Sequence, residues 1–183
     1  MDTWLPPDPD LPGAVDLLGD GGRAMVARFL SDAGWSPGAI DPVQAFYRPG
    51  RCMTVRYDVK ARHHDGALEL LTLGAECRAG DPVQVWAFPD DPGLPGLPAA
   101  LEYPEEAGGG QPELLRYRPR RRAVLRYRFP AGHVLFGKVL SPTRAGRALA
   151  AARGLNASSG TGVSLALPTA GPAPGTLLLA PLA

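Results

Sequence analysis

A basic hairpin sequence that occurs twice in the chain constrains its fold most strongly. The segment YRPGRCMTVRY covers residues 47–57 and YRPRRRAVLRY covers residues 117–127, with Tyr, Arg, Pro, Arg, Arg and Tyr in the same register. A proline turn between two alternating runs is typical of a β-hairpin. The element DPDLPG at 8–13 also returns, as DPGLPG at 91–96. These offsets of 70 and 83 residues differ, whereas a solenoid keeps one period, so we expect two related subdomains instead.

The predicted elements form an α+β protein with two mainly antiparallel β-sheets and few helices, divided into subdomains 1–107 and 108–183. Apolar residues at helical spacing predict a helix over 20–33, and Ser141 before a proline begins a second helix that should end at Gly154. The segments SPGAIDP and TAGPAP should interrupt regular structure. Alternating apolar runs predict strands at 43–48, 52–60, 67–76, 83–89, 113–118, 123–129, 134–140, 163–168 and 176–183.

Charge is distributed unevenly along the chain, although the net charge is only +1. Residues 1–113 hold all 18 acidic residues and eight basic ones, a net charge of −10. Residues 114–183 hold 11 basic residues and no Asp or Glu, a net charge of +11. Such a split indicates either a phosphate-rich partner for the basic part or two halves that attract each other. It excludes a carboxylate acid–base pair and a magnesium-binding aspartate after Glu113.

The N-terminal sequence and the cysteine content favour a cytoplasmic protein. The start MDTWLPPDPD is acidic and proline-rich, unlike a secretory signal, and no apolar run approaches the ~18 residues of a membrane span. Two cysteines, Cys52 and Cys77, are too few for a disulfide framework. We therefore expect reduced thiols and no membrane partner.

The run ELLRYRPRRRAVLRYRFPAGHVLFGKVL, residues 113–140, places a basic hairpin before a strand with a lysine, and a predicted helix and two strands follow. In this order it resembles the N-terminal lobe of the aminoglycoside phosphotransferase and protein-kinase-like family. DPDLPG and the first hairpin resemble the cap region of bacterial phosphotransferases of this type. The resemblance implies a cap and an N-lobe only, because the family's catalytic and magnesium-binding aspartates belong to a C-terminal lobe.

The resemblance also implies a nucleotide-phosphate site made of Lys138, Arg120, Arg121 and Arg122. In the family the strand lysine binds the α- and β-phosphates of ATP and pairs with a helix glutamate. Here the following helix contains arginines and no glutamate, and the turn PRRR has no glycine to bring its backbone close to phosphate. We therefore expect weak ATP binding through the arginines, and magnesium only together with a C-terminal lobe. The residues alone leave open a solvated basic hairpin, with Lys138 reaching the surface.

The expected function is the nucleotide-binding-lobe portion of a small-molecule phosphotransferase, with no catalytic or metal-binding residue of its own. The alternative is a stand-alone, non-catalytic binding or protein-interaction module derived from that fold. The partner would be the missing C-terminal lobe or a second copy in a homodimer, because the apolar strand TLLLAPLA should present an uncovered edge. Aligning the turns at Gly66 and Gly132 places Thr72 opposite Lys138, so the first copy should lack the phosphate-binding lysine.

Two further ligand classes have weaker support in the sequence. Arginines interleaved with Tyr117, Tyr127 and Phe129 are typical of single-strand nucleic-acid binders. The acidic first part nearly cancels their charge, however, and the strand arginines share one alternation parity, as one solvated sheet face requires. The segment HHDG at 63–66 contains metal-ligand residue types, but adjacent histidines in an extended chain point to opposite faces. We therefore predict neither a nucleic-acid partner nor a metal site.

Overall fold

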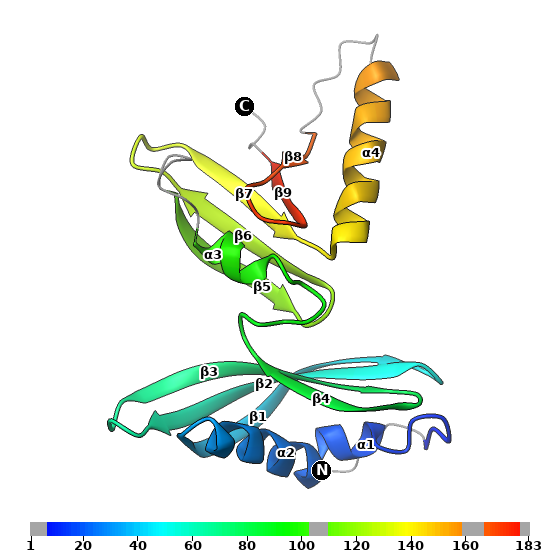
Figure 1. Ribbon diagram of the computed structural model, residues 1–183, viewed down its shortest axis with the longest axis vertical. Helices are drawn as coiled ribbons and strands as arrows, with labels where there is room; N and C mark the ends of the chain where they lie inside the picture. Colours follow the sequence, from blue (N-terminus) through cyan, green and yellow to red (C-terminus); the bar gives the residue numbers. More distant parts are fainter. Residues whose placement is uncertain (1–6, 103–109, 159–166, 180–183) are drawn as a thin grey trace. The chain divides into compact units, whose positions relative to one another are not determined.

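The computed structural model describes residues 7–102, 110–158 and 167–179. The chain divides into two compact units, Met1–Phe88 and Pro89–Ala183, and each is built on an antiparallel β-sheet with a few helices (Figure 1). The expected α+β class is confirmed. The division lies earlier than the boundary at 107/108 that the sequence suggested. The reason is that Asp91, in the repeated DPGLPG element, accepts a hydrogen bond from Tyr117 of the second hairpin, so this element belongs to the second unit.

Unit 1 is a four-stranded meander with two helices on one face (Figure 1). Alternate residues of its second strand point to the same side, and Val55, Tyr57 and Val59 are fully buried there against Val26 and Leu30 of the longer helix. The strands follow one another in the sheet in chain order. The elements are α1 (Ala14–Leu18), α2 (Asp20–Asp32), β1 (Trp35–Arg48), β2 (Cys52–His63), β3 (Leu68–Arg78) and β4 (Asp81–Ala87).

Strand β1 begins at Trp35, so the prediction that SPGAIDP interrupts regular structure is wrong. β1 is an edge strand of its sheet, where a proline can leave its outer side unpaired. The register with β2 shifts between Pro37 and Ile40 and again between Pro42 and Gln44. Local irregularities of the β-bulge type therefore accommodate the prolines within a continuous strand.

Unit 2 has a five-stranded sheet in the order β5-β6-β7-β9-β8. Tyr127 on one face donates a hydrogen bond to the carbonyl of Ala100 in the short helix, over 2.9 Å. Ala145 of the long helix α4 packs with Leu177 of β9 and with Leu140, which precedes the helix. The helix runs past Gly154, where the sequence predicted its end. The elements are α3 (Leu97–Leu101), β5 (Gln111–Arg118), β6 (Arg122–Arg128), β7 (Val134–Val139), α4 (Pro142–Ser158), β8 (Thr169–Ala170) and β9 (Thr176–Leu179).

The C-terminal strands differ from their predictions. β8 begins the segment TAGPAP, which was expected to be a connection, whereas residues 163–166 of the strand predicted at 163–168 lie outside the described residues. β9 confirms the start of the strand predicted at 176–183, whose residues 180–183 are also outside the described part. Because β9 lies between β7 and β8, it is not the uncovered edge from which a homodimer was inferred.

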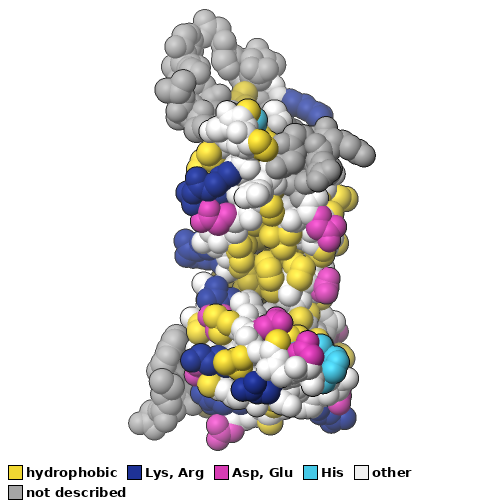
Figure 2. All heavy atoms as spheres, turned by 90° about the vertical axis from the view of Figure 1, so that its left-hand side faces the viewer, with side chains coloured by type: hydrophobic (Ala, Val, Ile, Leu, Met, Phe, Trp, Pro, Cys, Tyr) yellow, Lys and Arg dark blue, Asp and Glu magenta, His cyan; other side chains and the backbone are white. Residues whose placement is uncertain are grey.

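Some large apolar side chains remain on the surface. Leu68 and Leu70 at the start of β3 are 65% and 69% exposed, and Leu114 and Leu115 of β5 are also exposed. Figure 2 shows hydrophobic side chains at the surface with charged side chains of both signs around them. Within residues 7–102, 110–158 and 167–179, no helix combines the length and the apolar character needed to cross a membrane.

Candidate phosphate-binding site

Basic side chains of unit 2 gather on one face of its sheet. Arg118 pairs with Arg122 across the β5–β6 hairpin, and Val124 pairs with Lys138 across β6 and β7. Residues directly opposite each other in an antiparallel pair, and alternate residues along a strand, point to the same side. The same register places three further arginines on this face, as their alternation parity predicted: Arg116, Arg126 and Arg128.

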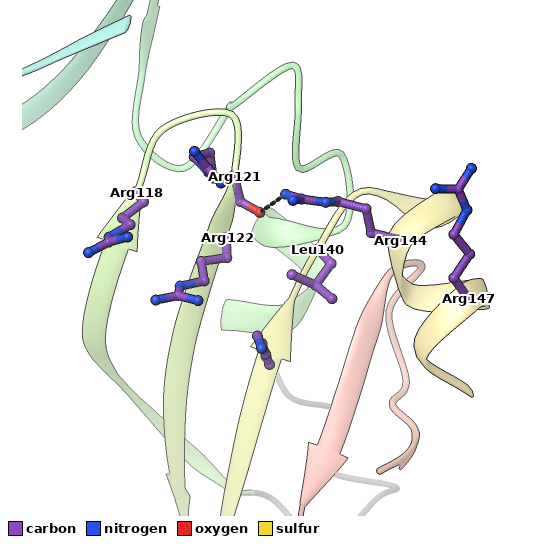
Figure 3. A pocket seen from close by; sticks show the side chains of 7 residues that line it. Arg118, Arg121, Arg122, Leu140, Arg144 and Arg147 are labelled. Atoms are coloured by element: carbon purple, nitrogen blue, oxygen red, sulfur yellow. Dashed lines mark hydrogen bonds between the residues drawn. The ribbon is translucent and has the colours of Figure 1, made fainter. Parts of the chain in front are cut away.

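A pocket of about 330 Å³ opens at the turn end of this face. Its residues come from the hairpin, from β7 and from the beginning of α4 (Figure 3). Apart from Leu140, every described residue that lines it carries a positive charge: Arg118, Arg121, Arg122, Lys138, Arg144 and Arg147. Like charges at this separation repel one another, and a bound polyanion would remove that repulsion. The volume lies at the lower end of the range for small-molecule pockets.

Two arginines of the pocket have buried donor atoms without a partner. Nε of Arg118 and Nε of Arg122 are shielded from solvent, and neither donates a hydrogen bond within the described part of the chain. A buried donor without an acceptor is costly, and guanidinium groups match the oxygens of a phosphate group. By contrast, Nη1 of Arg144 donates to the carbonyl oxygen of Arg121 over 3.5 Å (Figure 3). This bond connects α4 to the hairpin turn.

Arg120, the fourth predicted binding residue, does not line the pocket. Its backbone is left-handed, with φ of 61°, and its N–H donates to Asp91 over 2.7 Å. Its side chain lies against Gly93, since a Cβ on that glycine would come within 3.0 Å of Cδ of Arg120. The structure therefore brings together Lys138, Arg121 and Arg122, and places Arg120 behind the turn.

Sequence reasoning missed three cations of the pocket: Arg118, Arg144 and Arg147. A signal for each existed. Arg118 is the residue opposite Arg122 in any tight hairpin around the predicted turn. Arg144 and Arg147 lie three residues apart on the helix after the lysine strand, so they share a helix face.

The opposite end of the basic face is partly neutralised. Glu113 of β5 forms an ion pair with Arg126, with 2.5 Å between Oε2 and Nη2, and a longer one of 3.6 Å with Arg128. The hydrogen bond from Arg126 lowers the pKa of the Glu113 carboxyl, so it stays ionised. By contrast, the described residues that line the pocket include no carboxylate.

The strand register identifies the counterpart of Lys138 in unit 1. Thr54 lies three positions before Tyr57 and pairs with Glu76. In the same way, Val124 lies three positions before the second tyrosine of its own hairpin and pairs with Lys138. Glu76 therefore occupies the position of Lys138, and the expectation that Thr72 does so is wrong. The strands of the β2–β3 hairpin are longer than those of β6–β7. Aligning the two turns therefore matches residues that are not equivalent in the strand register.

Glu76 is buried in unit 1, whereas Lys138 at the equivalent position of unit 2 lines a pocket. Glu76 is only 2% exposed, and its Oε2 accepts from Nε of Arg78 over 2.7 Å while its Oε1 accepts from Oγ1 of Thr54 over 3.1 Å. Cys52, which is buried, stands where unit 2 has Arg122. Unit 1 thus satisfies the site with an internal ion pair and offers no cationic pocket at this position.

The segment HHDG forms a turn with its own internal contacts. The N–H of Ala67 donates to Asp65 over 2.9 Å, and this bond, followed by one from His63, lowers the pKa of the Asp65 carboxyl. The His63 ring lies 4.6 Å from the Trp35 ring, measured between centroids. Among the residues that the structure describes, no three His, Cys, Asp or Glu side chains gather into a metal-binding group.

The cations that line the pocket come from the hairpin, from β7 and from α4 (Figure 3), so the pocket is suited to attract a polyanion. The described residues that line it include no carboxylate and no imidazole, the side chains that most often act as a general base. No family model, curated protein or solved structure matches the chain.

Proposed function

We propose that unit 2 is the nucleotide-binding lobe of a small-molecule phosphotransferase of the kinase-like type, and that its pocket binds the phosphates of ATP. The observation that carries the proposal is that Lys138 and the arginine turn line one pocket, with no carboxylate among its described lining residues. Nε of Arg118 and Nε of Arg122, which are buried, can donate hydrogen bonds to a phosphate oxygen. The resemblance of residues 113–140 to the family's N-terminal lobe gives these cations their role.

Binding by this lobe alone is weak. The pocket contacts phosphate, but apart from Leu140 its lining offers no apolar surface on which adenine could stack. The dissociation constant for ATP is therefore on the order of millimolar. The attraction is mainly Coulombic, so affinity falls as salt rises through the physiological range.

Phosphoryl transfer itself needs groups that the pocket lacks. A catalytic base and magnesium ligands are carboxylates in phosphotransferases of this type, and the pocket is lined by cations and Leu140. We propose that a second lobe supplies those groups. Unit 1 then serves as a cap that has lost the phosphate site.

The test is a titration of the full chain with ATP followed by ³¹P NMR. The wild-type chain should bind with a millimolar dissociation constant, and Lys138→Met should weaken binding about tenfold, because one charge-assisted contact is lost. Lys60→Met, at an exposed position of β2 in unit 1, is the matched control and should leave the constant unchanged.

Two outcomes would contradict the proposal. One is the absence of saturable binding by the wild-type chain at ten times the expected constant. The other is equal weakening by Lys138→Met and Lys60→Met, which would indicate nonspecific attraction to surface charge. Either result would favour the alternative function, a non-catalytic protein-interaction module.

A further inference from the structure

The two hairpins are held by equivalent aspartates. In unit 1, Oδ2 of Asp8 accepts from the hydroxyl of Tyr47 over 2.7 Å and from the N–H of Gly50 over 2.8 Å. In unit 2, Oδ2 of Asp91 accepts from the hydroxyl of Tyr117 over 2.8 Å and from the N–H of Arg120 over 2.7 Å. One carboxylate oxygen thus binds both the first tyrosine of the hairpin and the backbone of its turn.

The DPDLPG and DPGLPG elements prearrange these aspartates. The other carboxylate oxygen accepts from the backbone two residues on, at Asp10 in unit 1 and at Gly93 in unit 2. The leucine of each element is buried, with Leu11 at 1% and Leu94 at 0% exposure. Such an Asx turn, anchored by a buried leucine, fixes the carboxylate before the hairpin contacts it.

The conformation of the turn depends on the aspartate more in unit 2 than it does in unit 1. The residue whose N–H is bound has φ of 63° at Gly50 and 61° at Arg120. Glycine adopts this left-handed conformation freely, whereas an arginine adopts it against the steric preference of its Cβ. The bond from Arg120 to Asp91, whose side chain is 2% exposed, therefore opposes relaxation of the turn.

We propose that Asp91 is a positioning residue for the phosphate site. It holds the left-handed backbone of Arg120, and thereby aims Arg121 and Arg122, the next two residues, into the pocket. Asp91 itself does not touch the ligand. This inference rests on the proposed function, because it assumes that the pocket binds phosphate.

The experiment compares Asp91→Asn with the matched variant Asp8→Asn in the full chain. The probe is inorganic tripolyphosphate, and its dissociation constant is measured well below the midpoint of thermal unfolding. Asp91→Asn should weaken binding about fivefold, because the arginines lose their preset orientation. Asp8→Asn should leave the constant within about twofold of the wild-type value, since unit 1 has no cationic pocket at its turn.

A rescue variant separates positioning from general stability. Adding Arg120→Gly to Asp91→Asn removes the steric cost of the left-handed turn, so the double variant should recover at least half of the lost affinity. A residue that only stabilised the unit would show no loss of affinity to recover, because binding is measured well below the midpoint of thermal unfolding. Tyr117→Phe, which keeps the ring and removes one donor to Asp91, should weaken binding less than Asp91→Asn and provides a milder second variant.

The outcomes distinguish this inference from the proposed function. Wild-type binding that Asp91→Asn and Tyr117→Phe both leave unchanged would overturn the role of Asp91 alone. Equal weakening by Asp91→Asn and Asp8→Asn would also overturn it, because the effect would not depend on the pocket. Failure of the wild-type chain to bind tripolyphosphate would overturn the proposed function and this inference together.

Discussion

The hairpins of units 1 and 2 share a scaffold but differ in what that scaffold presents. In both, an aspartate binds the turn, and the second tyrosine donates to the carbonyl of a short helix, at Leu17 for Tyr57 and at Ala100 for Tyr127. On the other face of the sheet, unit 1 has the buried Glu76 with its partner Arg78. At the equivalent position, unit 2 has Lys138, which lines a cationic pocket. The scaffold contacts are shared by the two units, whereas the residues on the other sheet face give each unit a different charge there.

The difference extends to the helices that each unit adds. Unit 1 places α2 between its short helix and its hairpin, and α2 packs into the main core. Unit 2 places α4 after β7, where Arg144 and Arg147 join the pocket. The shared part is therefore one short helix and three strands, and the helix that contributes to the candidate site lies outside it.

The largest expected effect concerns the glycines that end the two repeated elements. Gly13 and Gly96 have nearly the same backbone angles, with φ of −81° and −88°. A Cβ at Gly96 would collide with the carbonyl oxygen of Pro174, whereas one at Gly13 would meet only Sγ of Cys77 at 3.6 Å. Gly96→Ala should therefore destabilise unit 2 by about 3 kcal/mol, and Gly13→Ala should change unit 1 by less than about 0.5 kcal/mol. Urea unfolding, followed by the amide NMR signals of each unit, measures both changes in stability. Equal losses of stability in the two variants would contradict the close approach of Pro174 to Gly96.

A second effect concerns the charged residues at equivalent strand positions. Glu76→Gln removes the charge that Arg78 binds in a buried position, and should destabilise unit 1 by about 2 kcal/mol. Lys138→Met removes one of several mutually repelling cations, so it should not lower the stability of unit 2. Denaturant unfolding of the two variants checks this contrast. Loss of stability in Lys138→Met would show that the lysine is paired within the protein.

Substituting the residue with a left-handed backbone in each turn should change the stability of the two units in opposite directions. Arg120→Gly relieves a steric cost and should stabilise unit 2 by about 1 kcal/mol, whereas Gly50→Ala should destabilise unit 1 by a similar amount. Thermal unfolding of both variants gives the comparison. A destabilised Arg120→Gly protein would mean that the arginine side chain, packed on Gly93, contributes more than its backbone conformation costs.

The smallest expected effect is a dependence on acid. Hydrogen bonds from Gly50 N–H and from the Tyr47 hydroxyl lower the pKa of Asp8 from its ordinary value of 3.8. A carboxyl with a lowered folded-state pKa stabilises the unit above pH 3.8, and this stabilisation is lost as the pH falls through the folded-state value. Asp8→Asn should therefore flatten the acid limb of unit 1 stability relative to the wild-type chain. Asp10→Asn, an exposed neighbour, serves as the control and should leave that limb unchanged.

Local pattern predicted the basic hairpin and the strand that contains Lys138, and the resemblance of residues 113–140 to a kinase-like N-terminal lobe implied that Arg121, Arg122 and Lys138 form one site. The structure places these three residues around one pocket. Arg120 does not line the pocket, and its backbone has φ of 61°. In the sequence, only the glycine at the equivalent position 50 indicated such a left-handed conformation. Matching Glu76 with Lys138 required the strand register, because hairpin arms of different length leave no mark in the spacing of turns.

The fold showed the same limits. Strand alternation and turn residues predicted the two sheets. The two prolines of β1 predict an interruption instead, because the sequence alone does not show that β1 is an edge strand. The boundary between the units depended on long-range hydrogen bonds from Asp91 to the hairpin. Contacts of that kind, between residues 26 and 29 positions apart, have no local pattern from which they could be predicted.

The central claim is that only the second hairpin binds phosphate, although both share one scaffold. A titration of ¹⁵N-labelled full chain with tripolyphosphate, followed residue by residue in ¹H–¹⁵N spectra, compares the two hairpins in one sample. We expect saturable shifts at residues 118–122, 138 and 144–147, and none at residues 48–52 and 76–78 of unit 1. Shifts of similar size and affinity in both hairpins, or shifts confined to the first, would contradict that claim.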